Sequence, residues 1–210
     1  MKKTKVKIIQ SALKLFNEHG MVNVRLQHIA DEAFVSIGNM AYHYKNKEAI
    51  LIALYDDLVK NQKQLLAESR IVPLFENIDI LIQKTYLLQE EYIFFYLDTL
   101  EVVRGYPSIG DEHKKHIQFQ ISQLKVILDF NVARGALKKV EPNELHILAK
   151  QIWMTMNLWR TQESIFSNNT PNAEDYIAAI WNLLIPYFSQ MGKMEYAQLL
   201  ERPYDFFFQE

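Results

Sequence analysis

The sequence predicts an all-α protein in which a three-helix helix-turn-helix head precedes a larger C-terminal helical bundle. Apolar residues recur at three- and four-residue spacing along most of the chain, which is the period of an amphipathic helix. No stretch of useful length in the body alternates apolar and polar residues, as a half-buried strand does. Residues 25–47 (RLQHIADEAFVSIGNMAYHYKNK) predict two short helices joined by a tight turn and followed by a basic, aromatic end.

The composition narrows the class of protein. The 210 residues are 49% hydrophobic, which is enough for a folded protein with a buried core. The chain has no cysteine, which excludes disulfides, thiolate metal sites and a cysteine nucleophile. Polar residues interrupt the apolar ones after the N-terminal lysines, and no apolar run approaches the ~20 residues that span a bilayer. We therefore expect a cytoplasmic protein without a signal peptide or membrane segment.

Charge is distributed unevenly along the chain. Residues 1–50 contain eight Lys or Arg residues and four Asp or Glu residues, so they carry +4. The other residues carry −6, which gives the chain its net charge of −2. A nucleic-acid-binding head on a non-binding body would show this asymmetry, although a basic N-terminus is also common by chance.

The first helix is predicted from Thr4 to His19, and Gly20 is expected to follow its C-terminal cap. Four lysines, at positions 2, 3, 5 and 7, lie at the helix start, where the helix dipole disfavours positive charge. They indicate either a phosphate partner or a solubilising end. The apolar stripe of this helix is predicted to be Val6, Ile9, Ala12, Leu13 and Phe16.

Two short helices are predicted over residues 26–33 and from Ser36 to about residue 43. Phe34 and Val35 form the turn between them, and Ser36 is a favourable N-cap for the helix that follows. That helix is only about two turns long, too short to be stable without the rest of the head. Met40 and Tyr44 are expected to face inward.

The outward side of this short helix has the properties of a DNA-reading surface. A glycine and small side chains at its exposed start allow the backbone to approach base edges in a major groove. Asn39 suits an adenine edge, and Ile37 offers an apolar contact to a thymine methyl group. Tyr42, His43 and Lys47 supply donors for phosphate oxygens. The expected DNA-binding residues are Arg25, Gln27, Ser36, Ile37, Gly38, Asn39, Tyr42, His43 and Lys47.

The head resembles the N-terminal domain of the tetracycline-repressor (TetR) family of bacterial transcription regulators. The resemblance rests on three pieces in order: IIQSALKLFNEHG, IADEAFVSIGNM and YHYKNKEAIL. The sequence departs from the family pattern at three positions. Phe34 stands where the family usually has a glycine, Ala41 where it has a phosphate-contacting tyrosine, and Arg25 where it often has a threonine cap. Tyr42 is the candidate to replace the missing tyrosine.

A fourth helix, predicted at about residues 47–70 and capped by Asn46, links the head (1–46) to the body (47–210). Pro73 is expected to mark its end. Residues 105–111 and 167–172 are predicted loops, and Pro186 should kink the helix that contains it. Helices are predicted in the body near residues 74–90, 91–104, 111–134, 142–167, 172–191 and 193–202.

The last two long helices carry more apolar surface than one core needs, which indicates a helix–helix interface in a homodimer. The resemblance implies the same arrangement, and a two-fold dimer would bind a pseudo-palindromic operator in double-stranded DNA. The alternative is that these residues simply fill the core of one chain. The expected interface residues are Ile152, Met156, Ile177, Ile180, Trp181, Leu184 and Phe188.

The resemblance also implies a small-molecule effector that binds inside the body and shifts the heads relative to the DNA. Aromatic residues at helical spacing are more often core than pocket, so both interpretations stay open. The candidate ligand-binding residues are Phe94, Phe95, Asp98, Trp153, Met154, Asn157 and Trp159.

Motifs of catalysis are absent from the sequence: it has no Walker loop, no GxGxxG, no GxSxG and no Glu-x-x-His pair. Residues 111–116 (DEHKKH) come nearest to a metal site, but they are better interpreted as a solvated helix start. We expect no catalytic residue, metal or cofactor.

The leading hypothesis is a ligand-responsive repressor. The alternative, motivated by Phe34 and Ala41, is an effector-binding or protein-interaction module whose head has weakened or lost DNA binding. The C-terminal YDFFFQE segment is expected to pack on the body or on a partner subunit.

Overall fold

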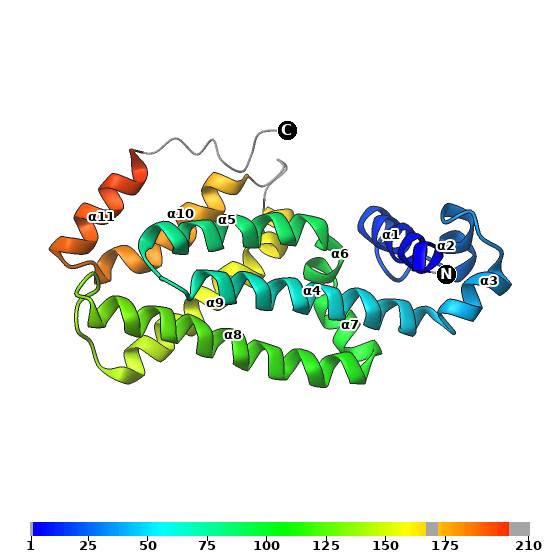
Figure 1. Ribbon diagram of the computed structural model, residues 1–210, viewed down its shortest axis with the longest axis horizontal. Coiled ribbons are helices and arrows are strands. Elements are labelled where there is room, and N and C mark those ends of the chain that lie inside the picture. Colours follow the sequence, from blue (N-terminus) through cyan, green and yellow to red (C-terminus); the bar gives the residue numbers. More distant parts are fainter. Residues whose placement is uncertain (1, 167–171, 202–210) are drawn as a thin grey trace. The chain divides into compact units, whose positions relative to one another are not determined.

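The computed structural model describes residues 2–166 and 172–201, and these residues fold into two compact units. Unit 1 comprises residues 1–61 and 88–114, and unit 2 comprises residues 62–87 and 115–210. The boundaries between the units fall within three long helices, α4, α5 and α8, which are labelled in Figure 1. The described residues form helices and no named strand, which confirms the predicted all-α class. The division of function between residues 1–46 and 47–210 stays a prediction.

Unit 1 is built around the N-terminal helices. The buried face of α1 consists of Ile8, Ser11, Ala12, Leu15 and Phe16, and the Phe16 ring lies 5.4 Å from the Phe94 ring. Of the predicted stripe, Ala12 and Phe16 are buried and Ile9 and Leu13 are half-buried, whereas Val6 is 53% exposed. Ile8 and Leu15, which the stripe did not include, are buried. The helices of unit 1 are α1 (Lys2–His19), α2 (Leu26–Glu32), α3 (Ile37–His43), the first part of α4 (Lys47–Ser69), the end of α5 (Phe75–Glu91), α6 (Ile93–Leu97), α7 (Thr99–Gly105) and the start of α8 (Pro107–Ala133).

Unit 2 buries one apolar cluster contributed by α4, α5, α8, α9 and α10. A carboxylate lies inside it: Asp79 accepts hydrogen bonds from the Trp181 indole at 2.7 Å and from the Gln83 amide at 2.6 Å. Burial raises the pKa of Asp79, and these two donors oppose the rise. Besides the last part of α4 and most of α5 and α8, unit 2 contains α9 (Pro142–Phe166), α10 (Ala173–Leu184), a 3-10 turn (Ile185–Tyr187) and α11 (Gln190–Leu200).

Three predicted helix boundaries were wrong. The loop predicted at residues 105–111 is mostly helix, because Pro107 takes the first position of α8, where a missing N–H costs nothing. The single helix predicted at 91–104 is broken at Tyr92 and Asp98. The helix predicted at 172–191 ends at Leu184, since Pro186 cannot donate the next helical hydrogen bond. The loop predicted at 167–172 and the YDFFFQE segment lie outside the described residues, except Asn172, which caps α10.

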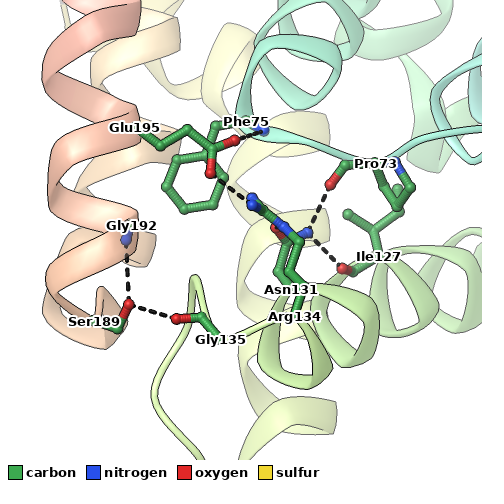
Figure 2. A network of polar contacts seen from close by, with 9 residues as sticks. All are labelled: Pro73, Phe75, Ile127, Asn131, Arg134, Gly135, Ser189, Gly192 and Glu195. Atoms are coloured by element: carbon green, nitrogen blue, oxygen red, sulfur yellow. Dashed lines mark hydrogen bonds and ion pairs between the residues drawn. The ribbon is translucent and has the colours of Figure 1, made fainter.

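The C-terminal helix α11 is fastened to unit 2 by a polar network (Figure 2). Glu195 pairs with Arg134 at 2.7 Å and accepts a 2.9 Å hydrogen bond from the backbone N–H of Phe75, at the start of α5. Asn131 donates to the carbonyl oxygens of Pro73 and Ile127, both at 2.8 Å. The network therefore ties the end of α8 and the start of α5 to the last described helix.

Candidate DNA-binding surface

The short helix α3 is held by its buried side, which leaves its other side open. Ser36 has an extended backbone and caps the helix, because its Oγ accepts a 3.2 Å hydrogen bond from the Asn39 N–H. Met40 and Tyr44 are buried, as predicted. The exposed residues of this segment are Ser36, Ile37, Gly38, Asn39, Ala41 and Tyr42, while His43 is half-buried with its ring 5.2 Å from that of Tyr42.

The turn between α2 and α3 has a Schellman geometry. The Val35 N–H donates to Ala30 O at 2.9 Å, and the Phe34 N–H donates to Asp31 O at 3.0 Å. This pattern requires a left-handed residue after the helix, and Phe34 adopts it with φ of 52°. Its side chain is 86% exposed, and the Lys7 Nζ lies 4.8 Å from the centre of its ring.

Arg25 and Gln27 lie exposed at the start of α2. Arg25 occupies the N-cap position, but a guanidinium has no acceptor, so its side chain caps nothing. The cap comes instead from His28, whose Nδ1 accepts a 3.2 Å hydrogen bond from the Arg25 N–H. Gln27 donates to Asp31 at 2.7 Å along the helix.

Lys47, a predicted DNA-binding residue, is half-buried. Its ammonium donates to the carbonyl oxygen of Met21 and lies 5.6 Å from the centre of the Phe16 ring. Burial lowers the pKa of Lys47, and the Glu101 carboxylate opposes this effect. Asn46 caps α4 as predicted, since its Oδ1 accepts a 2.9 Å hydrogen bond from the Ala49 N–H.

Further cations lie exposed around α3. Lys3, Lys5 and Lys7 are exposed on α1, and the Lys5 Nζ lies 5.4 Å from the centre of the Tyr44 ring. Lys45, which sequence reasoning did not name, is exposed just after α3. Its position directly before the capping residue Asn46 is the sequence signal that could have identified it. The exposed polar face of α3 is therefore bordered by positive charge on α1 and before α4.

Two family models match the chain. One, described as "Bacterial regulatory proteins, tetR family", matches residues 8–54. The other, described as "Bacterial transcriptional repressor", matches residues 60–196, which is more than half of the chain. The chain belongs to the TetR family. Its members are DNA-binding transcriptional regulators rather than enzymes, and the helix-turn-helix above lies in the first matched region.

Individual TetR-family proteins are similar to this chain at low identity. The HTH-type transcriptional regulator RutR of Escherichia coli (strain K12) is 24% identical over 145 residues, and the match covers 66% of this chain and 66% of RutR, just under two thirds of its length. A TetR-family transcriptional regulator from Marinobacter aquaeolei VT8 has a TM-score of 0.85 at 19% identity, covering 95% of this chain and 98% of its own. The fatty acid degradation regulator FadR from Bacillus halodurans has a TM-score of 0.68 at 17% identity, covering 87% and 94%. The two solved structures show a shared fold.

The candidate ligand-binding residues of this TetR-family chain are divided between the two units. Phe94 and Phe95 are buried in unit 1 with Asp98 nearby in sequence, whereas Trp153, Met154, Asn157 and Trp159 belong to unit 2. Within unit 2, the Trp153 indole donates to Gln120 at 2.9 Å and the Trp159 ring packs 5.4 Å from that of Tyr176, so both rings serve the helix packing. Met154 is exposed, and the Asn157 amide donates back to the Trp153 carbonyl at 2.9 Å.

A small hollow of about 20 Å³ lies in the core of unit 2. It is large enough for about one water molecule, but its walls are entirely apolar, so it is expected to be dry. Its lining residues are Ile78, Leu81, Ile82, Leu124, Ile127, Leu128, Ile152, Met156, Ile180 and Leu184.

All seven residues expected at a dimer interface are buried within a single chain: Ile152, Met156, Ile177, Ile180, Trp181, Leu184 and Phe188. A side chain that its own chain already covers has no surface left for a partner. In this structure the seven residues therefore fill the core of one chain, which was the alternative interpretation of the sequence. An interface on the same helices has to use their exposed neighbours.

The structure also places two histidines differently from expectation. Residues 111–116 were interpreted as a solvated helix start, yet His113 packs on aromatic rings of unit 1, and buried His116 lies 2.7 Å from the Gln62 amide oxygen in unit 2. In the described part of the chain, no group of three metal-ligating side chains comes together, and no helix is long and apolar enough to cross a membrane.

Proposed function

We propose that this TetR-family protein binds an operator in double-stranded DNA by inserting α3 into the major groove. The observation that carries the proposal is the geometry of α3, whose inward side is buried at Met40 and Tyr44 and whose capped N-terminal turn is open to solvent. In that turn Gly38 has no atom within 4 Å of the position a Cβ would take, so nothing in the chain itself occupies this side. A base edge can therefore approach closely.

The exposed side chains divide into two roles. We assign base reading to Asn39, whose amide matches an adenine edge, and to Ile37, whose methyl groups match a thymine methyl. We assign phosphate contacts to Arg25, Gln27, Tyr42 and the half-buried His43, which lie at the borders of the same surface. Other exposed positions on the surface, such as Ser36 and Lys45, would support these contacts.

Lys47 has a different role in this proposal from its neighbour Lys45. Because its ammonium is bonded to Met21 O inside unit 1, Lys47 supports the head first and can offer only its remaining donors to a phosphate. Exposed Lys45 is the better candidate for a contact that acts on the DNA alone.

We further propose a homodimer that binds a pseudo-palindromic operator and responds to a small-molecule effector. The dimer would use exposed apolar residues of α9, described below. The effector would enlarge the apolar hollow of unit 2, so its buried part would have to be mainly hydrocarbon. A regulator of chromosomal DNA acts where that DNA lies, so we also propose a cytoplasmic location.

The test is a binding titration of the protein against the DNA upstream of its own gene, repeated over a salt series. Specific binding that weakens steeply with salt supports the proposal. Asn39→Ala should relax preference at one base pair, whereas Lys45→Ala should weaken binding to all sequences and reduce the salt slope by about one. Weak binding that is equal for all sequences would instead favour an effector-binding module that has lost its DNA function.

A further inference from the structure

We infer that the Phe34 ring and the Lys7 ammonium form a second DNA contact beside α3, with the ring against the sugar–phosphate edge and the ammonium on a phosphate. The inference rests on the proposed DNA-binding function and concerns a residue pair outside the assigned surface. Its starting point is that Phe34 combines a left-handed backbone with a side chain that is 86% exposed.

The turn explains the backbone of Phe34 but not its side chain. The hydrogen bonds Val35 N–H to Ala30 O and Phe34 N–H to Asp31 O fix a Schellman turn, and any residue at this position must be left-handed. Glycine satisfies that requirement without strain, whereas a Cβ makes the conformation unfavourable. The turn would therefore be more stable with glycine, and the phenyl ring has to be explained by something else.

Packing within the chain does not supply that explanation. A ring that is 86% exposed buries little apolar surface, and the contact found for it is the Lys7 Nζ at 4.8 Å from the ring centre. An exposed cation–π contact is weak. A bulky residue held in a strained conformation without an internal gain indicates a functional constraint outside the chain.

The surroundings of the ring favour DNA as the external partner. Phe34 precedes the α3 cap Ser36 by two residues, so the ring adjoins the proposed reading surface. The Lys7 ammonium already lies on the ring, and among the described residues no ion pair involves it. Lys3 and Lys5 are exposed on the same end of α1. A partner that covers the ring must accept this positive charge, which suits phosphate.

The experiment compares four variants with the wild type in DNA titrations and thermal unfolding. Phe34→Gly should raise the melting temperature, because it removes the strain, and yet lower operator affinity about fivefold to tenfold. Phe34→Asn, which tolerates the left-handed region without a ring, should show a similar loss of affinity. Phe34→Tyr should keep the affinity. Lys7→Gln should weaken binding and reduce the salt slope by about one.

Two results would overturn the inference. If Phe34→Gly is more stable and binds the operator as tightly as wild type, the ring does not touch DNA. If the ring variants leave DNA affinity unchanged but alter self-association or binding of another protein, the ring is a protein contact. Both results presuppose specific binding by the wild type, so a failure of the proposed function is seen separately, as absence of that binding.

Discussion

The imidazole of His113 lies among aromatic groups of unit 1. Its ring centre is 5.2 Å from that of Phe95 and 5.9 Å from that of Tyr55, and it shares a 3.2 Å hydrogen bond with the Tyr55 hydroxyl. Burial lowers the pKa of His113 to about 4, because an imidazolium would lose hydration there. Burial first, and then the neighbouring Glu112 carboxylate, raises the pKa of Tyr55. Both partners are therefore neutral at pH 7.

This pair predicts a loss of stability in mild acid. The unfolded chain binds a proton on His113 near pH 6.5, while the native chain binds it only near pH 4. The contribution of the buried, neutral His113 to the free energy of unfolding is thus fully present above pH 6.5. It is lost as the pH falls to about 4, which lowers the free energy of unfolding by at most about 3 kcal/mol. Urea unfolding across this range measures it. His113→Gln keeps a polar partner for Tyr55 but does not titrate, so the same pH slope in the variant would contradict the assignment.

At the scale of elements, the break between α5 and α6 is fastened to α1 by one side chain. The Asn17 amide donates to Glu91 O at 2.8 Å, and its oxygen accepts a 3.2 Å hydrogen bond from the Phe94 N–H. Both backbone groups flank Tyr92, where the helix is interrupted and where the Tyr92 hydroxyl donates to Asp57 at 2.8 Å. Asn17 in this way joins α1 to α6.

We predict that Asn17→Ala destabilises the protein by about 1–3 kcal/mol, because it leaves two backbone groups at the helix break without their partner. Asn17→Asp should lie between wild type and Asn17→Ala, since it keeps an acceptor for Phe94 N–H but loses the donor to Glu91 O. Asn23→Ala is the control. This exposed residue makes one local bond to His19 O at 2.8 Å, and its removal should cost no more than about 0.5 kcal/mol. Equal effects of the Asn17 and Asn23 changes in urea unfolding would disprove the bridging role.

The corner between α10 and α11 depends on a close backbone approach. A Cβ placed on Gly192 would come within 2.2 Å of Ala136 O and 3.2 Å of its carbonyl carbon. Ser189 completes the corner by donating from Oγ to Gly135 O at 2.6 Å (Figure 2). Its N–H donates in addition to Ala136 O at 3.0 Å. The nearest obstacle is the backbone of Ala136, which cannot move aside like the end of a flexible side chain.

Gly192→Ala should therefore displace α11 and lower the free energy of unfolding by about 2 kcal/mol or more, despite the better helix propensity of alanine. Gly105→Ala is the matched control, because Gly105 lies in a helix and no atom comes within 4 Å of the place that the added methyl group would take. It should leave stability equal or slightly higher. Calorimetry that finds the two variants equally stable would mean that the corner opens without cost.

At the scale of the whole molecule, sequence periodicity predicted the helical class and most helix positions. It did not predict what each face of a helix packs against. The pattern of α3 was sufficient to place Met40 and Tyr44 inward and Asn39 outward, since both the cap and the inward residues are local signals. It could not show that Lys47 turns back to Met21 O, because that bond joins residues 26 apart. Nor could it show which chain covers an apolar residue, so Trp181 was assigned to an interface although unit 2 buries it.

Helix α9 carries a stripe of exposed apolar residues. Ile147, Met154, Leu158 and Ile165 are exposed apolar residues, and their spacing of seven, four and seven places them along one side of the helix. A long apolar stripe on a helix is typical of a surface that a partner covers, and a second copy of the chain offers the same stripe in a two-fold arrangement.

Leu158→Glu should therefore convert the proposed dimer to a monomer, because dimerisation would bury the new carboxylate in an apolar interface. Analytical ultracentrifugation measures the mass, and the same preparation should bind a full operator at least about a hundredfold more weakly, since each head then binds its half-site alone. Leu100→Glu is the control, as Leu100 is an exposed leucine of α7 in unit 1. If Leu158→Glu stays dimeric while folded, or if Leu100→Glu dissociates the protein equally, the α9 stripe does not form the interface.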